Sequence, residues 1–210
     1  MAKASSDYGN SVFVNCPFDG SYTPLFEAMV FTVFDCGFRA RCAMEIDDSG
    51  QIRIEKIFSI ISECRFGIHD LSRTEMDKVT QLPRFNMPLE LGIFLGAKRY
   101  GTGSQKQKVT LILDAQRYRY QTFISDISGQ DIRAHDGDPM ATIPLVRNWL
   151  RSSSSRSDIP GGMVIVRRYE RFCRQRRALR KKLRLSEDDQ LTFNDYTTLV
   201  AEWLKLLENS

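Results

Sequence analysis

The stretch KVTLILD, residues 108–114, carries an unbroken run of strand-forming side chains from Val109 to Leu113. A strand that is apolar on both faces is typical of a parallel sheet covered by helices on each side. We therefore predict a buried parallel strand at this position. The neighbouring segments then decide how the rest of the sheet is built.

Four other segments are short and rich in strand-forming residues, and helix-like patterns separate them. The predicted strands span residues 11–15, 38–44, 65–71, 108–114 and 131–134. The predicted helices span residues 24–34, 52–62, 85–100, 118–127 and 139–151. Strands that alternate with helices form parallel sheets with right-handed crossovers. The sequence therefore predicts an α/β fold, with a five-stranded, flavodoxin-like parallel sheet flanked by helices.

The last quarter of the chain has a different pattern. Residues 151–162 are rich in Ser, Pro and Gly, which is typical of a linker. Two helices with apolar faces are predicted after it, at 164–185 and 192–208, and such faces pack on each other or on the sheet domain. We predict two units: an α/β domain at 11–151 and a basic helical hairpin at 163–208.

Composition excludes several classes of protein. The apolar fraction of 42% is that of a soluble globular chain, and no apolar run reaches the length of a membrane span. The polar residues 1–10 lack a signal-peptide core and predict a short disordered lead-in. Five cysteines without a C-x-x-C pair argue against a disulfide framework or a zinc site, and two histidines are too few for a histidine metal centre. We expect a cytoplasmic protein without membrane contact, metal or cofactor.

The run NMPLELG, residues 86–92, is the strongest indication of function. Pro88 suits the first turn of a helix, and Asn86 is a plausible N-cap. Glu90 then falls in the first turn, where we expect the helix N-terminus to keep its carboxylate ionised. The run follows the third strand, and α/β folds bind ligands beyond the carboxyl ends of their strands. We therefore predict a catalytic crevice built from the loops at 16–22 and 70–86.

Several of these residues together resemble a known pattern. The residues are Asp70-Leu71-Ser72, Asn86, Glu90-Leu91-Gly92 and Ala97, with the opening Val14-Asn-Cys-Pro-Phe-Asp19. Over residues 11–150 the chain resembles the nucleoside 2-deoxyribosyltransferase-like group and the related Toll/interleukin-1 receptor (TIR)-like NAD-cleaving domains. The resemblance implies a flavodoxin-like fold and cleavage of an N-glycosidic bond. It also implies that Glu90 acts at the anomeric carbon, as nucleophile or charge stabiliser, and that Asp70 helps to hold the sugar.

The chemistry explains why one glutamate is enough. Breaking a nucleosidic bond builds positive charge on the sugar, which a nearby carboxylate stabilises or traps. NAD, here a substrate and not a cofactor, releases nicotinamide as a neutral molecule. Many deoxyribosyltransferases carry an Asp-x-Gly-Thr-like run where this chain has Pro88 and Leu89, so we expect hydrolysis more than base transfer. The candidate substrate-binding residues are Asn15, Phe18, Asp19, Tyr22, Asp70 and Asn86, with Phe18 and Tyr22 as stacking rings.

Structural interpretations of the same residues stay open at this stage. Glu90 is also explained as a solvent-facing residue at a helix start, and Asp70 as the cap of a turn. Asn86 is better explained as an N-cap than as a ligand, and Phe18 and Tyr22 as packing residues. We interpret Cys16, at the end of the first strand, as a structural cysteine, because no histidine lies nearby in sequence to activate it.

Residues 167–184 hold ten Lys or Arg against one acid, so this segment contributes +9 to a chain total of +4 and leaves −5 for the rest. One interpretation is a face for nucleic acid or an acidic protein. The other is a solvated helix whose apolar stripe packs on the α/β domain. The candidate residues are Arg167, Arg168, Arg171, Arg174, Arg177, Arg180 and Lys181. The alternative function is therefore a non-enzymatic nucleotide or nucleic-acid sensor. The family resemblance, in contrast, implies a role in bacterial antiviral defence or in a toxin system. It also implies that the protein forms a homo-oligomer.

Overall fold

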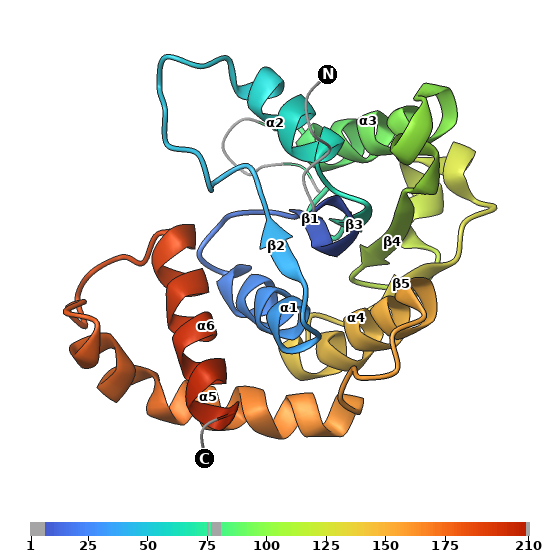
Figure 1. Cartoon of the computed structure of the whole chain (residues 1–210). Coiled ribbons are helices and arrows are strands. Elements are labelled where there is room, and N and C mark those ends of the chain that lie inside the picture. Colours follow the sequence, from blue (N-terminus) through green and yellow to red (C-terminus); the bar gives the residue numbers. More distant parts are fainter. Residues whose placement is uncertain (1–6, 75, 77–80, 209–210) are drawn as a thin grey trace.

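The computed structural model describes residues 7–74, 76 and 81–208, which contain an all-parallel five-stranded sheet with the strand order β2-β1-β3-β4-β5 (Figure 1). The strands are β1 (Ser11–Asn15), β2 (Arg39–Arg41), β3 (Phe66–Asp70), β4 (Val109–Asp114) and β5 (Ile132–Ala134). This is the flavodoxin-like arrangement, so the predicted fold class is confirmed.

Helices cover both faces of this sheet. They are α1 (Thr23–Asp35), α2 (Arg53–Ser62), α3 (Asn86–Tyr100), α4 (Pro139–Ser154), α5 (Gly162–Lys182) and α6 (Phe193–Glu208). In Figure 1, α2 and α3 lie on one face and α1 and α4 on the other. The pair α5 and α6 forms a further layer outside α1. No helix in the described part of the chain is long and apolar enough to cross a bilayer.

The central strands are buried because both of their faces contact apolar side chains. Every residue of β1 and β3 is buried. Alternate residues of β1 serve different cores: Phe13 packs with α2 and α3, whereas Val12 and Val14 join the core on the α1 side. This double burial explains the apolar character of the central strands. In β4, for which the sequence predicted burial, Leu111, Ile112, Leu113 and Asp114 are buried and Val109 and Thr110 are half-buried.

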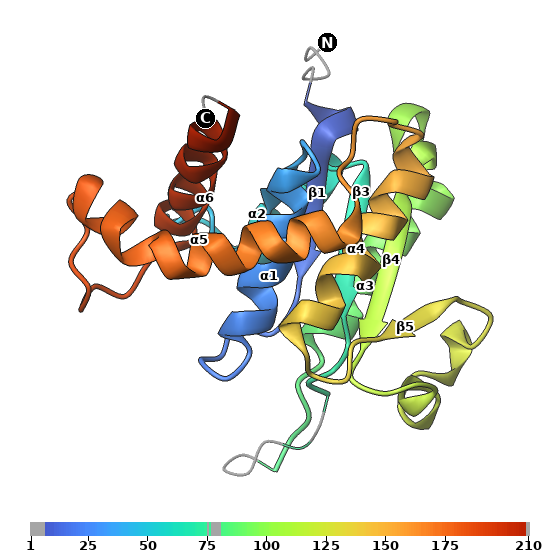
Figure 2. The ribbon, with the colours of Figure 1, turned by 90° about the horizontal axis from the view of Figure 1, so that it is seen from below.

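The two C-terminal helices share the main core with the α/β fold. Phe31 of α1 lies 5.2 Å from Tyr169 and 5.3 Å from Phe172 of α5, and 5.7 Å from Trp203 of α6, measured between ring centroids. Figure 2 shows α5 running across α1 and α4. Helices α5 and α6 therefore pack on each other and also on the α/β fold. The sequence left these two arrangements open as alternatives, and the structure contains both.

Three local predictions need correction. The predicted helix at 118–127 is a pair of 3-10 helices, Arg119–Thr122 and Ser125–Ile127, because Phe123 and Ile124 between them have non-helical φ angles of −133° and −148°. The edge strand predicted at 38–44 is shorter, since it pairs only along Arg39–Arg41. The sequence predicted a disordered lead-in at residues 1–10. Residues 1–6 lie outside the described residues, whereas Tyr8–Asn10 forms a 3-10 helix, so the prediction is wrong for that part.

The linker is also shorter than predicted. Helix α4 continues through Ser154, whose hydroxyl donates to the carbonyl oxygen of Leu150 at 2.6 Å. It ends where Ser155 takes a left-handed conformation with φ of 58°. Part of the predicted loop 72–84 lies outside the described residues, while Met76 and Pro83 form an isolated antiparallel bridge.

Gly67 in β3 allows α3 to pack closely on the sheet. A Cβ there would lie 2.7 Å from Cζ of Phe94 and 2.8 Å from Nε2 of His69, both fully buried. We expect Gly67→Ala to lower the free energy of unfolding by roughly 1–3 kcal/mol through overpacking. Chemical denaturation measures the change.

Gly96 supplies the matched control for this substitution. It lies inside α3, and a Cβ there meets no atom within 4 Å. Gly96→Ala should therefore raise the free energy of unfolding by roughly 0.5–1 kcal/mol, because alanine is the better helix former. Equal effects of the two substitutions would contradict the packing described for Gly67.

Candidate functional site

Polar residues gather where the strands of the sheet end. Asn15 is the last residue of β1, Asp70 of β3 and Asp114 of β4, and His135 follows β5 directly. In a parallel sheet these carboxyl ends meet at one edge, where α/β proteins bind ligands. The candidate site is built at this edge.

Asp70 is the centre of a buried hydrogen-bond network. Its carboxylate accepts hydrogen bonds from the Tyr22 hydroxyl at 2.5 Å, from Nε2–H of His135 at 2.9 Å and from the Ser72 N–H at 2.7 Å. Burial alone would raise the pKa of Asp70, but these donors outweigh it and hold the pKa below its ordinary value. Asp70 thus stays ionised and joins three separate loops.

This position changes the expected roles of Asp70 and Tyr22. Asp70 is fully buried and lines neither of the cavities described below. It therefore acts on a ligand only indirectly, by fixing the loops around it. The contact with the Ser72 N–H is also the turn cap that the sequence left as an alternative. Tyr22 is only 1% exposed, which contradicts the predicted stacking role for its ring.

Asn15 links the first strand to the start of α3. Its side-chain N–H groups donate to Nδ1 of His69 at 3.0 Å and to the carbonyl oxygen of Met87 at 2.9 Å. Burial lowers the pKa of His69 to about 3, so its ring is neutral and Nδ1 can accept. Asn15 is itself buried, and its amide is used to hold α3 against the sheet.

Glu90 lies on that helix and lines a cavity of about 200 Å³ together with Arg53 and Asn86. It is 6% exposed, and its carboxyl group forms no hydrogen bond or ion pair with residues 7–74, 76 or 81–208. Burial raises the pKa of Glu90 to about 7, and the positive charge of Arg53 acts in the opposite direction. Glu90 is therefore an acid without a partner, facing a cavity.

Two predictions about this helix are wrong. The N-cap is Phe85, not Asn86, and Asn86 is the first helical residue, exposed at the cavity. Glu90 is consequently the fifth residue of α3, beyond the first turn in which the helix dipole acts strongly. Desolvation therefore outweighs the dipole, and the carboxylate is not held ionised as expected. The alternative of a solvent-facing Glu90 is excluded as well.

A second cavity, of about 570 Å³, lies beside the first. Phe18 and Asp19 from the β1–α1 loop line it, and Phe193 and Asn194 at the start of α6 line it from another side. Phe18 is 37% exposed and packs edge-on against Phe26, with ring centroids 5.6 Å apart. Arg53 lines both cavities, so the two spaces adjoin at this residue.

The acidic side chain of Asp19 is partly exposed in the larger cavity. It accepts hydrogen bonds from the Ser21 hydroxyl at 2.6 Å and the Tyr22 N–H at 3.0 Å, and it lies 3.6 Å from Arg84. Burial is the largest single effect and would raise the pKa of Asp19, but these hydrogen bonds and the nearby arginines together outweigh it and lower the pKa. An ionised carboxylate at this place can accept hydrogen bonds from sugar hydroxyls.

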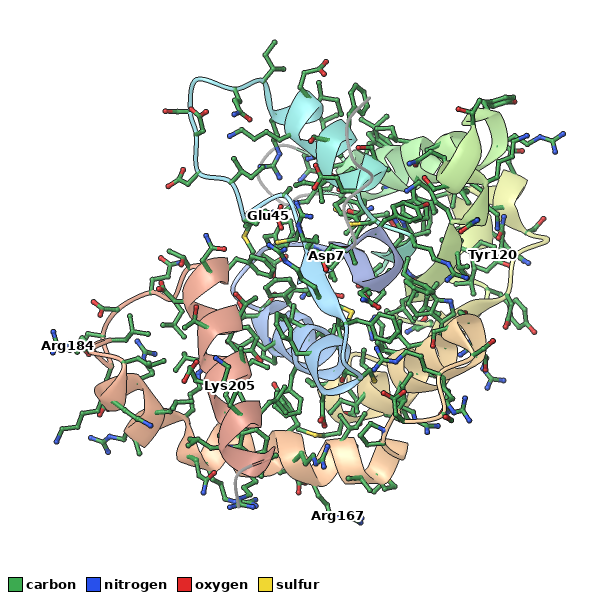
Figure 3. All side chains as sticks on the ribbon, viewed as in Figure 1. Asp7, Glu45, Tyr120, Arg167, Arg184 and Lys205 are labelled. Carbon is green, nitrogen blue, oxygen red and sulfur yellow. The ribbon has the colours of Figure 1, made fainter. Side chains whose placement is uncertain are left out.

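The basic helix α5 divides its charges between two sides. Arg168 pairs with buried Asp35 at 2.7 Å, and Arg176 holds both carboxylate oxygens of Glu27 at 2.7 and 2.8 Å. Arg177 pairs with Glu187, and Arg180 donates to the carbonyl oxygen of Asp189 at 2.7 Å. Four candidate residues remain exposed without such a contact among the described residues: Arg167, Arg171, Arg174 and Lys181. Figure 3 shows Arg167 on the outer side of α5.

The cysteines are free, and four are buried: Cys16, Cys36, Cys42 and Cys64. Burial raises the pKa of the Cys16 thiol well above its ordinary value, with the nearby acids adding to the effect. A neutral thiol is a poor nucleophile, which supports the structural interpretation of this residue.

Sequence reasoning missed three contributors to the site. His135 could have been found, because it follows a strand at the same edge as Asp70. Arg53 gave no signal beyond its place at the start of a helix. Phe193 lies far along the chain from Phe18, and only tertiary packing places both on one cavity.

The burial of Glu90 predicts a measurable dependence of stability on pH. The folded-state pKa of about 7 exceeds the ordinary 4.5, so stability is greatest below pH 4.5 and falls as pH rises through 7. Glu90→Gln removes this loss. We compare the change in the free energy of unfolding that Glu90→Gln causes at two pH values. This change should be more stabilising at pH 8 than at pH 5 by roughly 2–3 kcal/mol. Urea denaturation at the two pH values checks this.

Glu55→Gln on α2 is the control, because Glu55 is exposed and lines neither cavity. Glu55→Gln should change the free energy of unfolding by the same amount at pH 5 and at pH 8. If Glu90→Gln also behaved the same at both pH values, the burial of its carboxylate would be disproved.

Comparison of the chain with protein-family models, with curated proteins and with solved structures gives no match. The functional assignment therefore depends on the geometry of the site itself.

Proposed function

We propose that this protein is an N-glycosidase that hydrolyses the glycosidic bond of NAD or a related nucleotide, with Glu90 as the catalytic carboxylate. The observation that carries the proposal is the buried, unpartnered Glu90 at a cavity on the carboxyl edge of a parallel sheet. A structural acid this deeply buried normally has hydrogen-bond partners, as Asp70 does. Unpaired acids with a raised pKa concentrate at functional sites.

The reaction uses this environment directly. The bond between C1′ and the base breaks, its electron pair leaves with nicotinamide, and positive charge develops on the ribose. The Glu90 carboxylate stabilises that charge strongly because its residue is shielded from solvent, with only 6% of its surface exposed. Water then adds to C1′, and its proton passes to Glu90 and on to solvent. Asp19 offers acceptors for sugar hydroxyls, and Phe18 offers an exposed ring.

The raised pKa of Glu90 suits a cationic substrate. Near pH 7 an empty site holds a mixture of protonated and ionised Glu90, and the positively charged nicotinamide ring favours the ionised form. Leu89 lines the same cavity, in the stretch where deoxyribosyltransferases often carry polar residues. An apolar side chain offers no hydrogen bond to an incoming base, so we propose hydrolysis rather than transfer.

The cellular setting forms part of the proposal. Five free cysteines suit a reducing compartment such as the cytoplasm. Hydrolysis of NAD harms the cell that carries it out, which suits antiviral defence or a toxin system.

Purified protein should release nicotinamide from NAD, and Glu90→Gln should lower kcat/KM at least about a hundredfold, the scale for losing one charge-stabilising group. Chromatographic quantification of nicotinamide and ADP-ribose measures both. Glu55→Gln should retain wild-type turnover. Turnover that survives unchanged in Glu90→Gln would remove Glu90 from the mechanism and, with it, this function.

The exposed side of α5 favours a second candidate function, a nucleic-acid sensor. Arg167, Arg171, Arg174 and Lys181 follow one another at helical spacing, so they form an outward basic stripe. Such a stripe contacts phosphates independently of sequence and is sensitive to salt. The exposed Glu170 beside it weakens the positive field only in part.

If the stripe binds duplex DNA or RNA, replacing all four residues by Gln should reduce the magnitude of the slope of log affinity against log salt by about 3.6. Fluorescence anisotropy at several salt concentrations gives this slope. Replacing Lys98 and Arg99, exposed on α3, by Gln should lower the slope far less. Absence of binding by the wild type at low salt would exclude the sensor function.

A further inference from the structure

Arg53 stands at the junction of the two cavities. It is the first residue of α2, it is exposed, and it lines both the 200 Å³ space next to Glu90 and the 570 Å³ space next to Phe18. Its guanidinium forms no hydrogen bond or ion pair with any described residue. An exposed guanidinium at this junction is therefore available to a ligand that enters either cavity.

The backbone at the same point also has free donors. Helix α2 has ten residues, and its N-cap Ile52 supplies no side-chain cap. The N–H groups of Glu55 and Lys56 bond to the carbonyl oxygen of Ile52, whereas those of Arg53 and Ile54 have no partner within the described part of the chain. Two backbone N–H groups and one guanidinium without a described partner thus belong to Arg53 and Ile54, which line the smaller cavity. This combination is the one that binds phosphate groups in proteins.

The smaller cavity supplies an independent indication of a ligand. Glu90 is 6% exposed, has no hydrogen-bond or ion-pair partner among the described residues, and lines the same cavity as Arg53 and Ile54. A helix N-terminus alone could be satisfied by water. Here it adjoins an unpaired acid in a largely apolar pocket formed with Ile57 and Leu89. The acid and the anion-binding group therefore line the same smaller cavity, and Arg53 lines the larger cavity as well.

The volumes limit what the ligand can be. A cavity of about 200 Å³ is smaller than the roughly 300–1,000 Å³ typical of whole-ligand sites, so it holds only part of a nucleotide. The 570 Å³ cavity is large enough for a second nucleoside. Its wall contains the exposed ring of Phe18 and the carboxylates of Asp19 and Asp47, which suit a base and its ribose hydroxyls. The same carboxylates repel free phosphate, so the phosphates belong at Arg53 and not deeper in this cavity.

Resting on the proposed function, we infer that the substrate is a dinucleotide that lies across both cavities, with its pyrophosphate bound by Arg53 and the N-terminus of α2. The ribose whose bond is cleaved lies beside Glu90, and the second nucleoside lies beside Phe18. Arg53 is a binding residue in this arrangement, and its positive charge also faces the Glu90 carboxyl group. The inference distinguishes a dinucleotide from a simple nucleoside as substrate.

Binding to a variant that cannot turn over tests the inference apart from catalysis. In the Glu90→Gln background, isothermal titration calorimetry is carried out with ADP and with adenosine. We expect ADP to bind at least tenfold more tightly than adenosine, because a charged hydrogen bond to phosphate contributes this much or more. Adding Arg53→Gln should weaken ADP binding at least tenfold and leave adenosine binding unchanged. Equal affinity for the two ligands, or no binding of ADP, would overturn the inference.

Two further variants make the result specific. Arg99→Gln, an exposed arginine on α3 that lines neither cavity, is the matched control and should leave ADP binding unchanged. Phe18→Ala should weaken ADP and adenosine alike, about tenfold, through lost stacking. If Phe18→Ala affects neither ligand, the second nucleoside does not occupy the larger cavity and the inference fails.

The outcomes also separate this inference from the proposed function. ADP binding that depends on Arg53, together with no hydrolysis of NAD by the wild type, would retain the dinucleotide site and reject the reaction. The opposite result is hydrolysis of NAD that depends on Glu90 but has a KM for NAD that Arg53→Gln does not change. That result would retain the proposed reaction and reject the pyrophosphate site at Arg53.

Discussion

The site depends first on one buried charge. The carboxylate of Asp70 is removed from water at the end of the central strand β3, and an ion in that position is tolerated only when donors surround it. The donors come from three places in the chain: Tyr22 before α1, Ser72 after β3 and His135 before α4. If any one of these donors is lost, the buried carboxylate of Asp70 has too few hydrogen bonds and the fold is destabilised. The network therefore fixes the positions of the three loops. The β1–α1 loop that carries Phe18 and Asp19 takes its position from this network.

Glu90 contrasts with Asp70 at the same edge of the sheet. Both acids are buried, but Asp70 has three donors and a lowered pKa, whereas Glu90 has none among the described residues and a pKa raised to about 7. The unpaired acid destabilises the fold at neutral pH. Such a cost is characteristic of functional positions, where a group is arranged for a ligand and not for the folded state. In the proposed function, the cationic sugar supplies the missing partner.

The C-terminal helices contribute more to the site than their place in the sequence indicates. The start of α6 forms one wall of the larger cavity, and Tyr196 there donates from its hydroxyl to the carbonyl oxygen of Glu27 at 2.8 Å. Helix α5 binds α1 through ion pairs of Arg168 and Arg176 and directs a basic stripe outwards. The charge excess of this segment therefore serves two purposes, docking on one side and an open positive surface on the other.

The sequence by itself determined the five strands and the order of elements, and it selected Glu90 as the candidate catalytic residue. These depend on local patterns: the apolar run at 109–113, the alternation of strands and helices, and an acid near the start of the helix that follows the third strand. Only the tertiary structure decided the ionisation of Glu90, the structural role of Asp70 and Tyr22, and the contributions of Arg53 and Phe193. Each of these depends on neighbours distant in sequence, because desolvation and hydrogen bonding are set by the atoms that surround a group and not by the residues beside it in the chain.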